Sequence, residues 1–294
     1  MQPLKINSAL FFTVVFWASA FVGIRVGLGS YSPGALALFR FIIASACMVL
    51  ISYFLPNRKK VLWFDRLQLV LLGIGAIGLY NICLNYGEVT VTAGVASFVI
   101  GLIPVFTVLL SIIFLHERPR IVVYFGIIIS LLGLLLMALA EGVDTPLDRG
   151  VFIILIASSM GAIDTVIQKR YLIRYHPITV TAWVIWGGTL SLLFFAPELW
   201  RDIKIAKTDA TIAAVYLGVF PGALAYVAWS FVLNYLPASK ASMYLYILPI
   251  ISTLMGYLFL NEHPAILSLT GGVIAMAGAI CAARWSRAPL TYTD

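Results

Sequence analysis

Ten long, predominantly apolar stretches follow one another along the chain, separated by short segments that hold most of the charged residues. A helix needs about 20 such residues to cross the hydrocarbon core of a bilayer, whereas a strand of a membrane barrel needs only about ten residues of alternating polarity. The pattern therefore predicts an all-α polytopic membrane protein with ten transmembrane helices. The predicted spans are residues 8–29, 34–55, 67–87, 91–115, 121–140, 150–172, 178–196, 211–233, 238–260 and 265–284.

The composition agrees with lipid as the main solvent. Hydrophobic residues make up 62% of the chain and charged residues only 11%, whereas soluble domains carry about 25% charged residues. A water-soluble globular protein is excluded, and so is a disordered chain, because disordered chains are poor in apolar residues. Lys5 and Ala18-Ser19-Ala20 also resemble a cleavable signal peptide,. Because the apolar run continues to Leu28, we interpret this segment as the first span.

The placement of basic residues predicts the orientation. Ten spans put both termini on one side of the membrane. If that side is cytoplasmic, thirteen Lys and Arg residues fall on it and four on the other side, as the positive-inside rule requires,. The net charge of +7 is therefore explained by topology rather than by nucleic-acid binding. The thirteen are Lys5, Arg58, Lys59, Lys60, Arg66, Arg118, Arg120, Lys169, Arg170, Arg174, Lys240, Arg284 and Arg287, and the four are Arg149, Arg201, Lys204 and Lys207.

The sequence also repeats itself. Residues 93–138 align without gaps to residues 238–283 at an offset of 145. We therefore expect two five-helix halves, residues 1–145 and 146–294. Since five is odd, the second half enters the membrane in the opposite sense, and such inverted repeats are typical of secondary transporters with a binding site near the midplane. Further matches are Leu84-Asn85-Tyr86 with Leu233-Asn234-Tyr235 and Ser32-Pro33 with His176-Pro177, which set Tyr80 opposite Trp229 and Arg25 opposite Lys169.

The recurring motifs resemble those of a known family. Each half ends in a proline-containing helix, a Glu-x-Pro loop and a glycine-bearing helix, and residues 17–21 read Trp-Ala-Ser-Ala-Phe. Together with Ser32-Pro33 and Arg40, these features resemble the EamA-type drug/metabolite transporters. The resemblance implies a ten-helix inner-membrane exporter of amino acids or related metabolites. Within the family the chain is most similar to bacterial YddG-type aromatic amino-acid exporters.

One half departs from that pattern. The sixth span lacks the Trp-x-x-x-Phe signature of the first span and carries Gly161, Asp164 and Gln168 instead. We therefore expect the two halves to contribute unequally to a site.

Two prolines lie in the middle of predicted spans. Pro104 and Pro249 each remove a backbone donor and free a carbonyl near Ile100 or Leu245,. We interpret them as shaping or hinging a cavity, and a static kink covered by packing is the alternative.

Four charged residues lie within or at the ends of spans: Asp164, Arg25, Arg40 and Lys169. Asp164 lies deep in the sixth span, where a carboxylate is costly and indicates function,. It could bind a substrate ammonium or carry a coupling proton, or else pair structurally with Lys169 or Arg170. Arg25 and Arg40 could bind a substrate carboxylate, or else pair with Glu88 or Glu262.

Aromatic and polar residues of the spans are candidates for the walls of a binding cavity, because rings stack on planar substrates and hydroxyls form hydrogen bonds without buried charge. Membrane-interface positions are their alternative location. The candidates are Trp17, Tyr80, Asn81, Asn85, Tyr86, Ser97, Trp229, Tyr244 and Tyr246.

Other motifs predict scaffold contacts. Gly126 and Gly133 recur at Gly271 and Gly278, which favours close packing between the fifth and tenth spans,. Glu117 and Glu262 are each predicted to cap the helix that follows. Three scattered cysteines support neither a disulfide framework nor a metal site,, and we expect no cofactor.

The leading prediction is a secondary transporter for a small molecule, without catalytic residues, as a monomer or homodimer. A passive facilitator or channel, or a multidrug or cation exporter of the same fold, is the alternative. A membrane-embedded enzyme is disfavoured, because the chain has no His-Glu-x-x-His pair and no Gly-x-Ser-x-Gly motif,. ATP drive is not indicated, since no phosphate-binding loop of the Gly-x-x-x-x-Gly-Lys type exists,.

Overall fold

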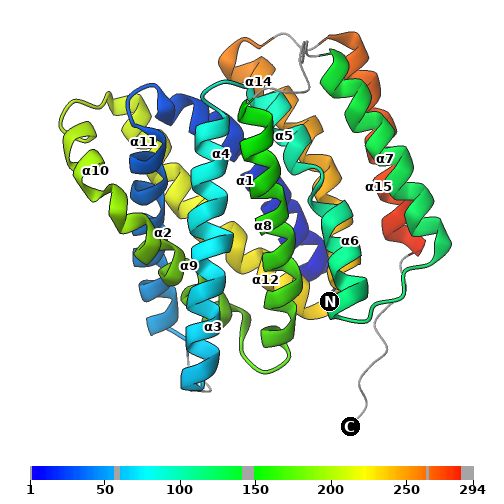
Figure 1. The fold of residues 1–294 in the computed structure, drawn as a ribbon, viewed down its shortest axis with the longest axis horizontal. Helices are drawn as coiled ribbons and strands as arrows, with labels where there is room; N and C mark the ends of the chain where they lie inside the picture. The colour runs from blue at the N-terminus through cyan, green and yellow to red at the C-terminus, as the bar shows by residue number, and fades with distance from the viewer. Residues whose placement is uncertain (1, 56–59, 141–148, 263–264, 286–294) are drawn as a thin grey trace.

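A computed structural model describes residues 2–55, 60–140, 149–262 and 265–285, and its regular structure over these ranges is helical without strands. The helices run side by side in one bundle, and the first helix begins at the same end of the bundle at which the last helix ends (Figure 1). The predicted all-α polytopic architecture is confirmed.

Eight helical stretches of the described chain are long and apolar enough to cross a membrane. Two further helices, α7 (Ile121–Ala140) and α15 (Ile266–Trp285), contain shorter apolar stretches, so the count of ten predicted spans is met only when these are included. The eight are α1 (Gln2–Leu28), α2 (Pro33–Tyr53), α3 (Trp63–Gly73) with η1 (Ile74–Leu79) and α4 (Tyr80–Gly87), α5 (Ala93–Ile100) with α6 (Ile103–Phe114), α8 (Arg149–Leu172), α9 (Pro177–Leu192) with η2 (Leu193–Phe195) and α10 (Ala196–Asp202), α11 (Thr208–Val219) with η3 (Phe220–Leu224) and α12 (Ala225–Tyr235), and α13 (Ala238–Met243) with η4 (Tyr244–Ile247) and α14 (Leu248–Leu260).

Several helices extend beyond the predicted spans. The first begins at Gln2 rather than residue 8, the third at Trp63 rather than residue 67, and the seventh span continues through short helices to Asp202. The apolar run marks the part of a helix inside the hydrocarbon core. The polar turns at its ends are solvated outside that core, so hydropathy alone does not report them.

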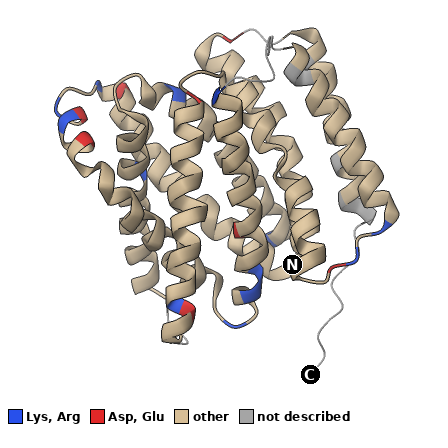
Figure 2. Ribbon diagram, viewed as in Figure 1, with Lys and Arg blue, Asp and Glu red and all other residues tan. Residues whose placement is uncertain are grey.

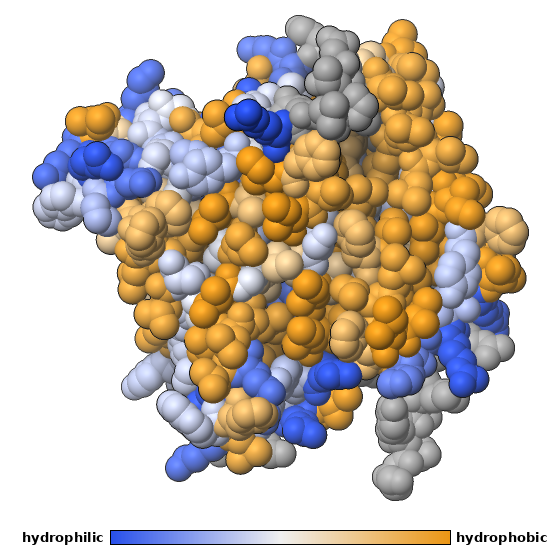
Figure 3. Space-filling view, viewed as in Figure 1, coloured by the Kyte–Doolittle hydropathy of each residue, from blue (hydrophilic) through white to orange (hydrophobic). Residues whose placement is uncertain are grey.

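The surface of the bundle carries a broad apolar belt. Charged residues gather at its two ends (Figure 2), and apolar side chains cover most of the visible face between them (Figure 3). On α7, Phe125 and Leu132 are 59% and 58% exposed. Exposed apolar side chains over such an area need lipid rather than water as their solvent.

Two membrane-spanning helices are interrupted at matching positions. Helix α5 ends at Ile100 and α6 starts at Ile103, with Pro104 in its first turn. In the other half a 3-10 turn, η4, precedes α14, and Pro249 lies in the first turn of that helix. Proline is tolerated in the first turn because the backbone donor that it lacks has no intrahelical partner there.

Glycines bring α7 and α15 into backbone contact. A Cβ atom at Gly126 would lie 2.7 Å from the carbonyl oxygen of Gly278, and one at Gly133 would lie 2.4 Å from the nitrogen of Ala275. The hydroxyl of Ser130 donates to the carbonyl of Ala275 at 2.9 Å. Gly126 lies against Gly278, and Gly133, further along α7, lies against Ala275, which comes earlier in α15. The two helices are therefore antiparallel, and the predicted close approach is present.

This contact gives a stability prediction. We expect Gly133→Ala to destabilise the folded protein by about 1–3 kcal/mol, because backbone atoms cannot yield as a flexible side chain can. Gly75→Ala is the matched control, since a Cβ atom there meets only the sulfur of Met160 at 3.5 Å. Thermal unfolding in detergent checks the difference, and equal midpoints for the two variants would contradict it.

Two other pairs of residues that the repeat makes equivalent are alike in structure or in contact. The Ser45 and Thr189 hydroxyls, 144 residues apart, lie 2.8 Å from each other between α2 and α9. His116 and Asn261, 145 residues apart, both have a φ of 54°, the left-handed conformation that ends a helix,.

Glu117 was predicted to cap the helix that follows it, α7, and this prediction is wrong. The Glu117 carboxylate accepts backbone N–H groups of Ala238 at 2.9 Å and Ser239 at 3.2 Å, so it caps α13 of the other half rather than α7. The N-terminus of a helix exposes backbone N–H groups that need an acceptor, and the sequence gives no sign of which loop supplies the acceptor for α13. The second capping loop includes residues 263 and 264, which lie outside the described residues.

Candidate functional site

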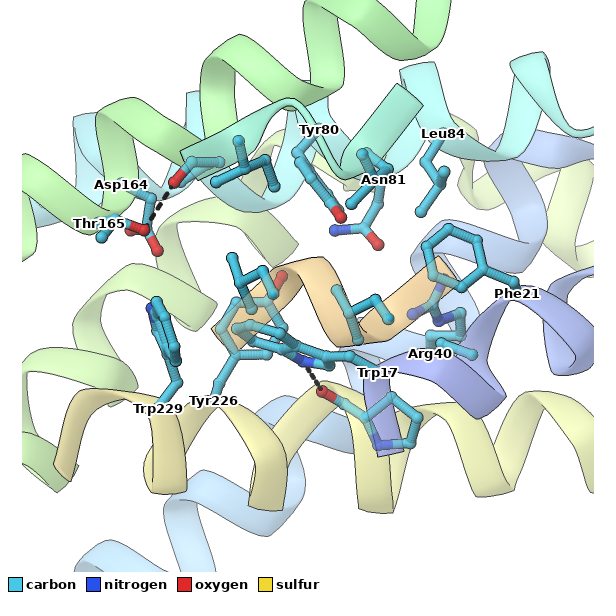
Figure 4. Close-up of a pocket in the computed structure, with 18 residues that line it drawn as sticks. Trp17, Phe21, Arg40, Tyr80, Asn81, Leu84, Asp164, Thr165, Tyr226 and Trp229 are labelled. Carbon is cyan, nitrogen blue, oxygen red and sulfur yellow. Dashed lines mark hydrogen bonds between the residues drawn. The ribbon is translucent and has the colours of Figure 1, made fainter. Parts of the chain in front are cut away.

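A cavity of about 660 Å³, its opening included, lies between the helices of the bundle (Figure 4). Its walls come from α1, α2, α8 and the interrupted regions of four other spans. Ala76 and Pro221 belong to the π-helical turns η1 and η3, which are frequent at functional sites,. The breaks in the helices are therefore gathered around one space.

The cavity is lined by equivalent positions of the two proposed halves. Trp17, Ala20 and Phe21 line it from α1, and at an offset of 144 their counterparts Gly161, Asp164 and Thr165 line it from α8. The helix breaks contribute in the same way. Their lining residues pair as Ile100 with Leu245 and Ile103 with Leu248 at an offset of 145, and Tyr80 with Trp229 at an offset of 149.

The paired positions differ in chemistry. The first half places an indole, a methyl group and a phenyl ring where the second half places a hydrogen, a carboxylate and a hydroxyl. At these three positions α1 contributes apolar and aromatic groups, and α8 contributes small and polar ones.

Aromatic rings form the floor of the cavity in the view of Figure 4. The Trp17 ring lies 5.3 Å from that of Tyr226 and 5.4 Å from that of Trp229, measured between centroids. The Trp17 indole N–H donates to the carbonyl of Pro221 at 3.3 Å, which fixes the ring. The edges and faces of these rings offer a surface on which a planar group can stack.

Asp164 is 5% exposed and faces this cavity from α8. Its carboxylate accepts a hydrogen bond from the Gln168 amide at 3.3 Å. The basic residues that could have neutralised it are engaged elsewhere, since Lys169 donates to the Leu233 carbonyl and Arg170 to the Phe114 carbonyl. The structural pairing considered from the sequence is therefore not present.

Arg40 lies at the other end of the cavity from Asp164 (Figure 4). It is 3% exposed, and its Nε and Nη1 atoms have no hydrogen-bond partner among the described residues. Glu88 interacts with it electrostatically, but both Glu88 carboxylate oxygens also lack hydrogen-bond partners in this part of the chain. Buried polar groups nearly always have a partner. An unpartnered guanidinium on a cavity wall is thus free to bind an anionic group.

Tyr80 and Tyr226 lie between these two charges. Each is close enough to both Arg40 and Asp164 to interact with their charges. Their side chains face the space between the two ends in Figure 4. The cavity therefore has an acidic end, a basic end and phenol groups between them.

Arg25 and Lys169 do not line the cavity. Arg25 donates to the carbonyls of Glu88 at 2.8 Å and Val91 at 3.3 Å, next to the C-terminus of α4. Lys169 donates to the carbonyl of Leu233, in the last turn of α12, which is the counterpart of α4. Cations are stabilised at helix C-termini by the unpaired carbonyls and the helix dipole, so both residues have a structural partner.

Of the ten residues predicted to bind substrate, the cavity brings together Trp17, Tyr80, Asn81, Asp164 and Trp229. The other five lie outside its lining. Asn85 donates to the Pro33 carbonyl at 2.9 Å, Ser97 donates to the Gly94 carbonyl at 2.6 Å, Tyr86 is 40% exposed, and Tyr246 is buried in a second apolar cluster that Tyr244 contacts. Pro104 and Pro249 are also not in the lining, although their neighbours Ile103 and Leu248 are.

Three aromatic or polar residues of the lining were absent from the sequence prediction: Phe21, Thr165 and Tyr226. The first two could have been found from the repeat, since they are counterparts and neighbour Ala20 and Asp164. Tyr226 lies beyond the reach of motif matching, because the π-turn before it shifts the register of the helix,.

The sequence profile of the EamA-like transporter family matches the chain twice, over residues 4–139 and 148–284. The chain belongs to the EamA-like transporter family. The predicted family is confirmed, and so is the prediction of a membrane transporter rather than an enzyme. In the described residues no group of three or more His, Cys, Asp or Glu side chains could hold a metal ion.

Two relatives and one solved structure extend this result. The uncharacterized transporter YdfC of Bacillus subtilis is 39% identical over 262 residues, which cover 89% of this chain and 85% of the relative. A probable terminal-alkyne amino-acid exporter of Streptantibioticus cattleyicolor is 33% identical over 278 residues, covering 95% of this chain and 93% of the relative. A protein of known crystal structure shares the fold of this EamA-like transporter with a TM-score of 0.73 at 17% identity, over 94% of this chain and 96% of that chain.

Proposed function

We propose that this EamA-like transporter exports amino acids with aromatic or related hydrophobic side chains across the inner membrane, as a secondary transporter with both termini in the cytoplasm. The observation that carries the proposal is the buried Arg40 guanidinium, which faces an aromatic cavity with two nitrogens unpartnered. An amino-acid carboxylate pairs with a guanidinium through two parallel charge-assisted hydrogen bonds. The Streptantibioticus relative is named for amino-acid export.

The remaining walls fit the rest of such a substrate. With the carboxylate at Arg40, an apolar side chain lies against Trp17 and Tyr226, which occupy the middle of the cavity. Asp164 lines the cavity at the opposite end from Arg40 (Figure 4), whereas the ammonium of an amino acid shares its carbon atom with the carboxylate and stays beside it. We assign Asp164 to a coupling proton rather than to the substrate ammonium.

Transport then proceeds by alternating access between two inverted halves, residues 1–145 and 146–294. Support comes from the offset of 144 to 149 residues that relates opposite walls of the cavity, and from the matching breaks in the helices. In inverted-repeat transporters one half rocks against the other around a site near the midplane. The interrupted helices are the places where the backbone can bend.

A transport screen in proteoliposomes tests the function. Radiolabelled amino acids and hydrophobic cations are compared with and without a pH gradient, with protein-free liposomes as the control. We expect uptake of aromatic amino acids above that of charged ones, accelerated by the gradient. Uptake of hydrophobic cations with no uptake of amino acids would replace this proposal with a cation exporter.

The two prolines give a further prediction. Replacing both Pro104 and Pro249 by alanine should slow transport several-fold without preventing membrane insertion, because alanine restores the backbone donors and favours a continuous helix over each break. Initial uptake rates at equal protein content in the membrane check this. Rates equal to those of the unaltered protein would show that the prolines have no part in the motion.

A further inference from the structure

A second pocket lies at the C-terminal end of α2, where α2, α3 and α9 meet. It shares no lining residue with the cavity described above. Polar and aromatic side chains line it: Ser52, Lys60, Arg66, Thr179, Trp183 and Trp186. No acidic residue is among its lining residues. The pocket therefore holds two positive charges, those of Lys60 and Arg66, and no negative charge.

The donors in this pocket are only partly used. Arg66 Nε donates to the Val61 carbonyl at 2.9 Å, and its guanidinium lies 5.3 Å from the centre of the Trp183 ring. This arrangement orients the side chain, and Nε is the one Arg66 nitrogen with a hydrogen bond to the described residues. The Trp186 indole Nε1 is buried and has no partner in the described chain. A buried N–H without an acceptor is destabilising unless a ligand supplies one.

One acidic residue, Asp65, is the direct neighbour of Arg66 in the sequence. It lies in the first turn of α3, is buried, and accepts the Tyr175 hydroxyl at 2.5 Å. It is not part of the pocket lining, so it does not neutralise Lys60 and Arg66 there. Two cations, an indole N–H and two hydroxyls form a set of donors that suits the oxygens of a phosphate group.

The surroundings identify the source of that phosphate. Large side chains at the end of α2 and the start of α3 are strongly exposed, among them Tyr53 at 78%, Phe54 at 72% and Trp63 at 78%. Exposed aromatic residues at helix ends are typical of the membrane–water interface, where lipid head groups lie. Basic pockets between membrane helices near that level bind anionic head groups.

We propose that this pocket binds the phosphate head group of an anionic phospholipid. Arg66 and Lys60 supply the charge, and the Trp186 N–H supplies a directed hydrogen bond. A bound lipid would bridge the C-terminal end of α2, the start of α3 and α9. The proposal does not depend on which substrate the cavity transports.

Native mass spectrometry of the detergent-purified protein tests this proposal. Phosphatidylglycerol and phosphatidylcholine with identical acyl chains are compared as ligands, and inorganic phosphate is added as a competitor. We expect the unaltered protein to retain one phosphatidylglycerol with at least fivefold higher occupancy than phosphatidylcholine, and phosphate to leave it bound. Displacement by millimolar phosphate would assign the pocket to a soluble anion and overturn the proposal.

Two variants locate the lipid. Trp186→Phe keeps a ring but removes the unpartnered N–H, so it should fold normally, and Arg66→Gln removes the charge. Each should lower phosphatidylglycerol occupancy at least threefold. Lys204→Gln is the matched control, because Lys204 also lies over an indole, 4.5 Å from the Trp200 ring, at the other end of the molecule. If Trp186→Phe and Lys204→Gln retain the same amount of lipid, the pocket is not the binding site.

Discussion

Replacing Arg40 by glutamine should lower the rate of tryptophan transport at least tenfold. Removing one partner of a buried, hydrogen-bonded charge pair costs roughly 2–5 kcal/mol, and about 1.4 kcal/mol corresponds to a factor of ten. Folding should be little affected, since the Nε and Nη1 atoms of Arg40 make no hydrogen bond to the residues that the structure describes. Arg40→Lys keeps the charge but lacks the planar fork, so it should recover only part of the activity.

The substrate analogue tryptamine separates a binding role from a structural one. Tryptamine keeps the indole and the ammonium but lacks the carboxylate. The unaltered protein should discriminate strongly in favour of tryptophan, and Arg40→Gln should lose most of that discrimination. Arg25→Gln is the control, because Arg25 bonds to the Glu88 and Val91 carbonyls outside the cavity. If Arg40→Gln slows transport but discriminates as before, Arg40 has only a structural role.

Replacing Asp164 by asparagine should abolish the response of transport to a pH gradient while leaving exchange intact. Asparagine has nearly the same shape and can keep the bond to the Gln168 amide, but it cannot take up and release a proton. The variant should therefore accumulate no substrate against its gradient, whereas the unaltered protein should.

The control for Asp164 is Asp209→Asn. Asp209 lies in the first turn of α11, where its carboxylate accepts the backbone N–H of Ala210 at 2.8 Å, away from the cavity lining. This variant should keep the response to the gradient. Net uptake is measured in proteoliposomes with and without an imposed pH gradient. A gradient response in Asp164→Asn equal to that of the unaltered protein would reject a coupling role.

Much of the fold could be predicted from hydropathy, because lipid imposes a simple rule on every span. The helices that carry the predicted spans differ from them mainly at their polar ends, as at Gln2 and Asp202. The contact between α7 and α15 was also predictable, since glycines at seven-residue spacing leave one face of each helix open. The loop that caps α13 was not, because the contact between Glu117 and Ala238 joins residues distant in sequence.

The cavity was predictable only in part. Trp17, Tyr80 and Asp164 stood out by residue type, and all three line it. Tyr246 stood out equally but is buried in another cluster, since the side of a helix that faces a cavity depends on local breaks and π-turns. An apolar helix has little polar contrast around its circumference, so periodicity cannot supply this information.

Counterflow in proteoliposomes tests the central claim most directly. Vesicles containing the purified transporter are loaded with unlabelled tryptophan, diluted into buffer with a trace of labelled tryptophan, and sampled over time. A carrier that alternates its cavity between the two sides must show transient accumulation of label above the equilibrium level, and Arg40→Gln must reduce it. Label that enters only to equilibrium, at the same rate with and without internal tryptophan, would contradict the account and indicate an open pore.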